Sequence, residues 1–407
     1  MPRFSIVIPT RNRAHLLAYA LESALRQTAG DFEIVVSDNA STDETEAVAT
    51  KVASPRVRYV RSEQSLSMPD SWEFALAHAR GEYVTYLCDD DAIAPGTLST
   101  VERVLQRTRA KVAMWGGATY YHETWPEAER RNTVVVPTFT GRILEIASRS
   151  KLGEIYGLRL GRTPMLVNSV CHVSIVETVA RKAGRFFVGY SPDFAAGIAM
   201  LAHVPSFVFV DTILSVGGAT PVSTGMVVRQ SRGEVFQRTL QELGDQANLH
   251  RVPLRIHVQT AHLSEHFLLL KETFSAELRD YEIDWIQFFV NTSRELDIYA
   301  RNGWDVSSDR TAWRDALAAQ PAPVQASVSQ RLAQTVDEDR AEEVQPVALT
   351  PLGIHDIVEC ARYLEGSRRT LKGIAKSTLV RILGDRWGLD LASSLSGLVR
   401  RARRRVR

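Results

Sequence analysis

Short apolar runs alternate with amphipathic stretches over residues 1–110. The apolar runs, which are typical of buried strands, are SIVIP (5–9), EIVVS (33–37), VRYV (57–60) and YVTYL (83–87). Between them, apolar residues recur at helical spacing, as in AHLLAYALESALRQ (14–27), which predicts helices with one face against a sheet. Strands that alternate with helices through short connections favour a parallel sheet covered on both faces. We therefore predict an α/β domain with a Rossmann-like, mostly parallel sheet.

The pattern becomes mixed after residue 110 and helical after about residue 230. Further strand-like runs lie at 111–115, 133–137, 166–170 and 206–210. Pro321 and Pro323, followed by an acidic stretch at 337–343, favour a linker. The predicted organisation is an α/β domain (1–225), a helical extension (226–318), a linker or exposed acidic loop (319–350) and a C-terminal helical unit with a basic end (351–407).

Composition narrows the class of protein. The chain has 407 residues and is 44% hydrophobic, which is enough for a large core, and its formal net charge of +2 does not favour a polyanion binder. Three widely spaced cysteines argue against a disulfide framework and fit a reducing compartment. Because neither a signal peptide nor an apolar run near the roughly 20 residues of a membrane span is apparent, we expect a cytoplasmic protein.

Polar residues cluster where the predicted strands end. PTRNR (9–13) follows the first strand, Asp38 closes the second, and Asp89, Asp90 and Asp91 follow the fourth. Ligands of parallel sheets bind at the carboxyl ends of strands. Adjacent carboxylates repel one another, and a divalent cation removes that repulsion, so the three aspartates indicate a metal site that could hold a diphosphate. A solvated acidic turn before Pro95 is the alternative.

Three of these segments together resemble a known family. SIVIPTRNR (5–13), EIVVSDNASTDET (33–45) and ARGEYVTYLCDDDAIAPGTL (79–98) are similar to the N-terminal half of family 2 glycosyltransferases of the GT-A fold, in order and in spacing. The resemblance is clear over residues 3–110 and fainter to about 220. It implies an inverting transfer of a sugar from a nucleotide-sugar donor, with a UDP-sugar favoured, to an acceptor hydroxyl. The acceptor would be a glycan or lipid-linked molecule in bacterial-type surface glycan or glycolipid assembly.

The resemblance also implies roles for residues that bind the nucleotide. Pro9 and Thr10 would line the base pocket with Arg11 beside it, and Asp38 would accept a hydrogen bond from the edge of the base.

The acidic triplet would hold Mn²⁺ or Mg²⁺ by the same resemblance. Asp90 would be the metal ligand, Asp91 would support it, and Asp89 would lie near the ribose or the metal. Many relatives carry aspartate where this chain has Cys88, so which carboxylate touches the metal stays open.

An inverting transfer needs a general base for the acceptor hydroxyl. In the family it is a carboxylate at the start of a helix, and the matching residue is Asp193 in GYSPDFAAGIAML (189–201). Favourable interaction of Asp193 with the helix N-terminus is the alternative interpretation. Asp211 and Glu177 fit the spacing less well.

The chain ends in LVRRARRRVR (398–407), in which Arg400–Arg407 contains six arginines and no acid. Such an end favours binding to an anionic membrane surface, which would place a cytoplasmic enzyme peripherally on the inner face. A solvated tail is the alternative, and nucleic-acid binding is disfavoured.

Three other functions compete with this interpretation. HLSEH (262–266) matches a zinc-peptidase pattern, but so short a motif arises by chance. A nucleotidyltransferase would be expected to carry a glycine-rich loop, and PTRNR has no glycine. A catalytically silent sugar-nucleotide-binding scaffold stays open.

Overall fold

The computed structural model describes residues 1–223, 234–334 and 346–367. The chain divides into two compact units, Met1–Arg362 and Tyr363–Arg407. Nearly all of the second unit, including the arginine-rich end, lies outside the described residues, so the fold below is that of the first unit.

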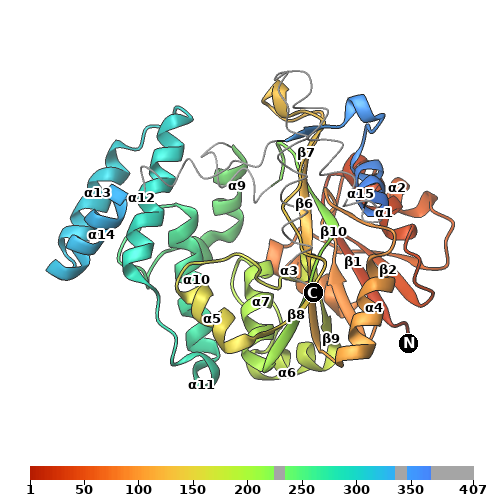
Figure 1. The fold of residues 1–407 in the computed structure, drawn as a ribbon, viewed down its shortest axis with the longest axis horizontal. Helices are drawn as coiled ribbons and strands as arrows, with labels where there is room; N and C mark the ends of the chain where they lie inside the picture. The colour runs from red at the N-terminus through yellow and green to blue at the C-terminus, as the bar shows by residue number, and fades with distance from the viewer. Residues whose placement is uncertain (224–233, 335–345, 368–407) are drawn as a thin grey trace, which may run out of the picture. The chain divides into compact units, whose positions relative to one another are not determined.

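Strands and helices alternate through the N-terminal part of the chain, as the hydrophobic pattern predicts (Figure 1). The elements are β1 (Phe4–Thr10), α1 (Ala14–Leu25), β2 (Phe32–Asp38), α2 (Thr45–Lys51), β3 (Val57–Arg61), α3 (Met68–Ala77), β4 (Tyr83–Tyr86), β5 (Ala92–Ile93) and α4 (Thr97–Thr108).

The strands that follow are interleaved with longer connections. They are β6 (Val112–Tyr121), β7 (Thr133–Val135), β8 (Ile143–Ala147), β9 (Ser169–His172) and β10 (Ser206–Ala219), with helices α5 (Ser148–Tyr156), α6 (Val173–Ala183) and α7 (Pro192–His203) among them. A short β11 (Val347–Ala348) pairs with β7, and α15 (Ile357–Ser367) ends the described part.

All these strands join one sheet. Its main path runs β11-β7-β6-β9-β4-β1-β2-β3, and β10 pairs with β5, β6 and β8. The pairs β1–β2, β1–β4, β2–β3 and β6–β10 are parallel, whereas β9 runs antiparallel between β4 and β6. The parallel strands therefore direct the carboxyl ends of β1, β2 and β4 to the same edge.

Helices bury both faces of the sheet. Along β1, Ile6 and Ile8 belong to one hydrophobic cluster and Val7 to the other, because successive strand side chains point to opposite faces. The first cluster is completed by residues of α1 and α4, and the second by residues of α3, α6 and α7. The predicted α/β fold with a mostly parallel sheet and a helical C-terminal extension is confirmed.

The helical extension packs on the second cluster rather than forming a core of its own. Its helices are α9 (Glu234–Leu243), α10 (Gln259–Thr273), α11 (Ser275–Leu278), α12 (Trp285–Arg301), α13 (Ser307–Ala318) and α14 (Ala322–Gln334). Phe267 of α10, Phe288 of α12 and Val328 of α14 are fully buried in the same cluster as residues of α7. The two predicted segments, 1–225 and 226–318, thus share one apolar core.

The predicted linker over residues 319–350 is corrected in its first half, where α14 forms a helix. Pro323 lies in the first turn of α14, where its missing N–H costs nothing and its fixed φ suits the helix. The acidic stretch 337–343 lies outside the described residues.

In the described ranges, no helix is both long and apolar enough to cross a membrane.

Candidate functional site

The registers of β1, β2 and β4 bring the predicted site residues together. Thr10 pairs with Asp38 across β1 and β2, and the amide of Asn39 donates to the Thr10 carbonyl at 2.9 Å. On the other side of β1, the amide of Leu87 donates to Val7 at 2.9 Å, so the acidic triplet follows where β4 leaves the sheet. Pro9 lies within β1, one residue before this edge.

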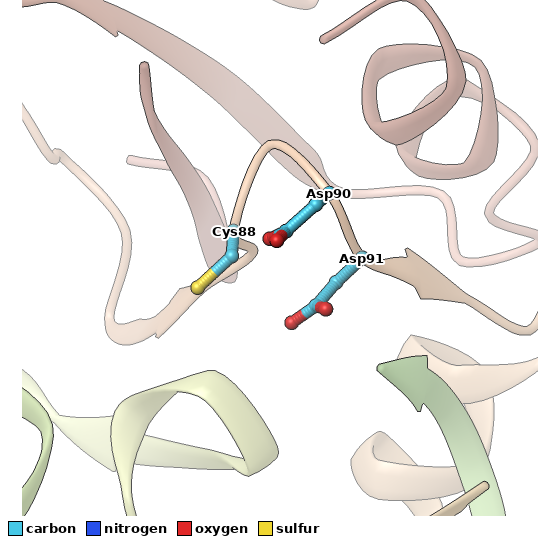
Figure 2. A group of neighbouring side chains, drawn as sticks. All are labelled: Cys88, Asp90 and Asp91. Atoms are coloured by element: carbon cyan, nitrogen blue, oxygen red, sulfur yellow. The ribbon is translucent and has the colours of Figure 1, made fainter. Parts of the chain in front are cut away.

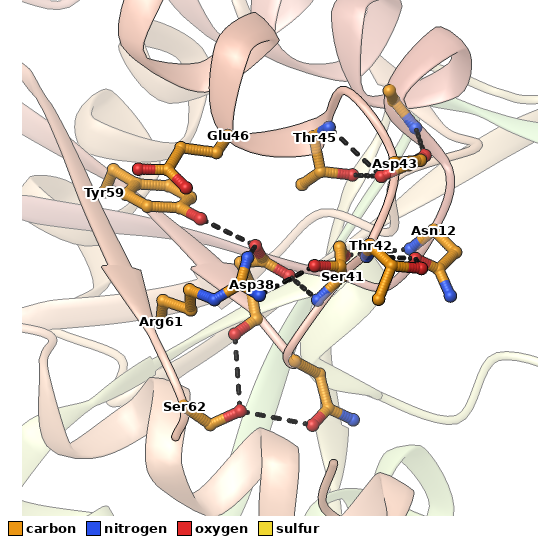
Figure 3. A network of polar contacts seen from close by, with 12 residues as sticks. Asn12, Asp38, Ser41, Thr42, Asp43, Thr45, Glu46, Tyr59, Arg61 and Ser62 are labelled. Atoms are coloured by element: carbon orange, nitrogen blue, oxygen red, sulfur yellow. Dashed lines mark hydrogen bonds and ion pairs between the residues drawn. The ribbon is translucent and has the colours of Figure 1, made fainter. Parts of the chain in front are cut away.

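Asp38 lies at the centre of a polar network (Figure 3). Its carboxylate is fully buried and accepts hydrogen bonds from the Ser41 amide at 2.8 Å, the Tyr59 hydroxyl at 2.6 Å and the Arg61 guanidinium at 2.9 Å. Burial, together with the bond to Asp38, raises the pKa of Tyr59 to about 12. Asp38 therefore joins the loop that follows β2 to strand β3, at the sheet edge where a nucleotide would bind.

The loops on either side of this network adopt left-handed backbone conformations. Asn12 has φ 53° and Ala40 has φ 54°. Asparagine tolerates this region, and its Oδ1 accepts from the Thr42 amide at 2.7 Å, but alanine adopts it only at a cost of about 1–3 kcal/mol. Strain of this kind tends to occur at functional sites.

Asp89 is held by the end of β1. The Thr10 hydroxyl donates to it at 2.8 Å and the Arg13 guanidinium at 3.0 Å. Arg13 also donates to the Val222 carbonyl, so it joins the acidic loop to the segment that follows β10. Burial alone would lower the pKa of Arg13, but the charges of Asp89 and Asp90 raise it above its ordinary value.

Cys88, Asp90 and Asp91 form the metal-binding candidate of the described residues (Figure 2). One ligand atom from each lies within 4.8 Å of the others. All three side chains project from the loop between β4 and β5 toward one side.

The charges in this loop are unbalanced. Burial, and then repulsion from Asp90, raises the pKa of Asp91 well above its ordinary value. Burial also raises the pKa of Asp89 to about 6, although Arg13 opposes it. The thiol of Cys88 stays neutral because burial and the nearby carboxylates raise its pKa. A bound cation would relieve this repulsion, and the two carboxylates fit a hard divalent ion better than the neutral thiol does.

Strand β10 and the segment that follows it supply contacts that the sequence did not predict. The Gly218 amide donates to Asp91 at 2.9 Å, and the Ser223 hydroxyl donates to Asp90. A Cβ atom at Gly218 would lie 1.8 Å from the Asp90 carbonyl oxygen, so only glycine allows this approach. Gly218 and Ser223 are therefore site residues that the sequence analysis did not name, and the glycine pair at 217–218 was the one available signal for them. Arg13 joins them from the PTRNR segment.

Asp193 lies in the first turn of α7, as predicted. Its Oδ1 accepts from the Ser191 hydroxyl and the Phe194 amide, both at 2.8 Å. The charge of Asp193 also contributes to raising the pKa of Cys88, so these two groups lie within electrostatic range of each other.

Arg11 points toward the helical extension. Its guanidinium forms an ion pair with Glu242 of α9 at 3.3 Å, and both side chains are exposed. This contact places α9 beside the end of β1.

Side chains of the HLSEH motif make structural hydrogen bonds to backbone groups of neighbouring segments. Glu265 accepts from the amides of Arg251 and Val252 at 2.6 Å and 3.1 Å, and His266 bonds the Val188 carbonyl at 2.7 Å. Because a carbonyl only accepts, His266 Nε2 carries the proton of this bond.

The parallel sheet and its acidic strand ends can be compared with those of known proteins, and one family model matches this part of the chain. Residues 5–169 match the model described as "Glycosyl transferase family 2". This part of the chain is therefore similar to family 2 glycosyltransferases.

Two curated relatives share this region. The GalNAc(5)-diNAcBac-PP-undecaprenol beta-1,3-glucosyltransferase of Campylobacter jejuni is 38% identical over 104 residues, which are 25% of this chain and 34% of the relative. The putative colanic acid biosynthesis glycosyl transferase WcaA of Escherichia coli is 33% identical over 100 residues, 24% of this chain and 36% of the relative. The chain thus spans about a third of the length of these relatives.

Among solved structures, TarS 1–349 of S. aureus in complex with UDP-GlcNAc is similar over 90% of this chain and 92% of that chain. The TM-score is 0.47 and the sequence identity 16%.

Proposed function

We propose that this protein is an inverting, metal-dependent glycosyltransferase that moves a sugar from a nucleotide-sugar donor to an acceptor hydroxyl. The observation that carries the proposal is the cluster of buried, mutually repelling carboxylates at the end of β4, in a domain of family 2. Such a cluster is unfavourable by itself and favourable around a divalent cation.

Asp90 and Asp91 would hold Mn²⁺ or Mg²⁺, with Cys88 close by. The cation, when bound, neutralises charge on the donor diphosphate as it leaves.

The chain's own residues would bind the nucleoside at the ends of β1 and β2. Thr10 and Arg13 hold Asp89, which would lie near the ribose or the metal, while Asp38 holds the loop of Ser41 in place through its buried bonds. Pro9 and Arg11 would border the base, for which a uracil nucleotide is the favoured candidate.

Asp193 would act as the general base. It takes the proton of the acceptor hydroxyl as that oxygen forms a bond to the anomeric carbon. The bond from the anomeric carbon to the diphosphate breaks on the opposite face, and its electron pair leaves with the nucleoside diphosphate. No covalent enzyme intermediate is needed, which fits the neutral, half-buried thiol of Cys88.

For the acceptor we propose a glycan or a lipid-linked glycan in bacterial surface assembly. The Campylobacter relative is named for an undecaprenol-linked substrate. Arg400–Arg407 would then bind the anionic inner surface of the membrane, although these residues lie outside the described part.

Asp193→Asn tests the proposed base, because an amide keeps the shape but takes no proton. We expect nucleoside diphosphate release from a UDP-sugar with Mn²⁺ and acceptor to fall by about 100-fold or more, with unchanged donor binding by calorimetry. Asp297→Asn, an exposed carboxylate of α12 that pairs with Arg310 at 2.7 Å, serves as a comparison for loss of a charge without loss of a base.

Normal turnover by Asp193→Asn would assign the base to another residue. Donor binding without any release by the native protein would favour the silent scaffold instead.

A further inference from the structure

A cavity of about 290 Å³ lies between the α/β domain and the helical extension. Its lining comes from two segments, with Arg185 and Tyr190 in one and Asp245, Asn248, His250 and Arg251 in the other, and from α10. This volume is at the lower end of the range for ligand pockets, about 300–1,000 Å³, and suits a group the size of one sugar ring.

The cavity is close to the proposed site on two sides. Tyr190 precedes Asp193 by three residues, so their Cα atoms are at most about 11 Å apart. On the other side, Asp245 follows Glu242 by three residues, and Glu242 pairs with Arg11 at the end of β1. Arg185 in turn bonds Asp70 of α3 at 2.9 Å. The cavity thus lies between the start of α7, which carries the proposed base Asp193, the sheet edge where β1 ends, and the helical extension.

Helix α10 fixes the two lining segments with the residues of the HLSEH motif. His266 bonds Val188, and the Tyr190 hydroxyl donates to the His262 carbonyl, which holds the segment that leads to Asp193. Glu265 accepts from the Arg251 amide and guanidinium, which holds the opposite segment. The residues of the HLSEH motif therefore hold both lining segments of the cavity in place on α10.

The lining has balanced charge. Arg185 and Arg251 are matched by Asp245 and Glu265 among the lining residues. Both arginines are already paired with carboxylates, Arg185 with Asp70 and Glu73 and Arg251 with Glu265 and Glu272. A phosphate site would need cations in excess, so the cavity favours a neutral ligand.

Hydrogen-bonding capacity is nevertheless available. Nε and Nη2 of Arg185 are buried and make no hydrogen bond within the described residues. Asp245, Asn248 and His250 are exposed at the rim and supply acceptors and donors. Tyr190 and Leu269 add apolar surface. A ligand with several hydroxyls and an apolar ring face matches this mixture.

From these observations we infer that the cavity binds a neutral pyranose residue of the acceptor glycan. This inference rests on the proposed glycosyltransferase function, which it deepens by assigning the acceptor class to a site. It also assigns the helical extension a role, because six of the nine lining residues come after residue 240.

Saturation-transfer NMR with the full chain tests the inference. The probes are the methyl glycosides of glucose, galactose, N-acetylglucosamine and N-acetylgalactosamine, with inorganic phosphate and glycerol phosphate as the anion arm. We expect at least one glycoside to bind the native protein, and its affinity to fall about ten-fold or more in Asp245→Ala/His250→Ala. Asp280→Ala, an exposed carboxylate of the extension, is the matched control and should bind normally.

Three outcomes would overturn the inference: no glycoside binds the native protein, the double variant binds as tightly, or only the anions bind and are lost in the variant. Calorimetry with UDP and Mn²⁺ on the same samples separates the two claims. Absent UDP binding by the native protein contradicts the proposed function, whereas intact UDP binding with unchanged glycoside binding contradicts the acceptor site alone.

Discussion

Ser223 lies outside every motif that the sequence displays, yet its hydroxyl donates to the carboxylate of Asp90. Arg13 and the Gly218 amide do the same for Asp89 and Asp91. Each carboxylate of the triplet therefore has a protein donor that partly offsets its charge. Hydrogen bonds to charged groups contribute about 1.5–3 kcal/mol, which is comparable to the energies that decide metal affinity.

We expect Ser223→Ala to strengthen the binding of Mn²⁺ by about ten-fold. The variant lacks the hydrogen bond to Asp90 that a bound cation would displace, and without it the carboxylates repel one another more strongly. Electron paramagnetic resonance of free Mn²⁺ measures the affinity directly. Ser329→Ala on the exposed surface of α14 should change nothing. Weaker binding by Ser223→Ala would mean that the hydroxyl holds Asp90 in the orientation that the cation requires.

At the scale of elements, the apolar runs predicted β1 to β4 closely because buried parallel strands are continuous hydrophobic segments. The acidic triplet and Asp38 were singled out as candidates because the carboxyl ends of such strands converge. Strand β10 was predicted only over 206–210, whereas it extends to Ala219. Asp211 and the glycines at 217–218 break the apolar pattern, and pairing with β6 overrides it. Contacts such as Ser223 to Asp90 depend on that tertiary pairing, so the sequence could not indicate them.

Helix α10 should make stability depend on pH. Burial lowers the pKa of both His262 and His266 from about 6.5 to about 4. The unfolded chain therefore binds these protons at a higher pH than the folded chain, and stability is full above pH 6.5 and is lost as the pH falls toward 4. The loss should reach about 3 kcal/mol for each histidine at pH 4.

Urea denaturation from pH 7 to pH 4 measures this loss. His262→Gln/His266→Gln should flatten the profile in this window, because glutamine bonds the Val188 carbonyl without titrating. An equally steep profile in the variant would show that other groups cause the loss.

At the scale of the molecule, one apolar core joins the α/β domain to the helical extension. The sequence predicted a domain boundary at residue 225 because the spacing of apolar residues becomes helical after it. Such a change marks a change from strands to helices and does not mark the end of a hydrophobic core. The basic end adds a further proposed function to the whole chain, that of bringing the site to an anionic surface.

Removal of the residues after Gly397 should release the protein from phosphatidylserine-containing vesicles in a sedimentation assay. Each of the arginines that follow contributes about 1 kcal/mol near such a surface. Neutral vesicles should retain neither form. If the shortened and full chains sediment equally with anionic vesicles, the basic end is a solvated tail.

The central claim is a metal-dependent nucleotide site at the ends of β1, β2 and β4. Calorimetric titration of the native protein and of Asp90→Ala with UDP, GDP and TDP, each with and without Mn²⁺, tests it most directly, with circular dichroism to verify the fold of the variant. The account predicts that one nucleotide, UDP first, binds the native protein only with Mn²⁺ and that Asp90→Ala remains folded and loses this binding. Binding that is equal in the two proteins, or no binding of any nucleotide to the native protein, would contradict it.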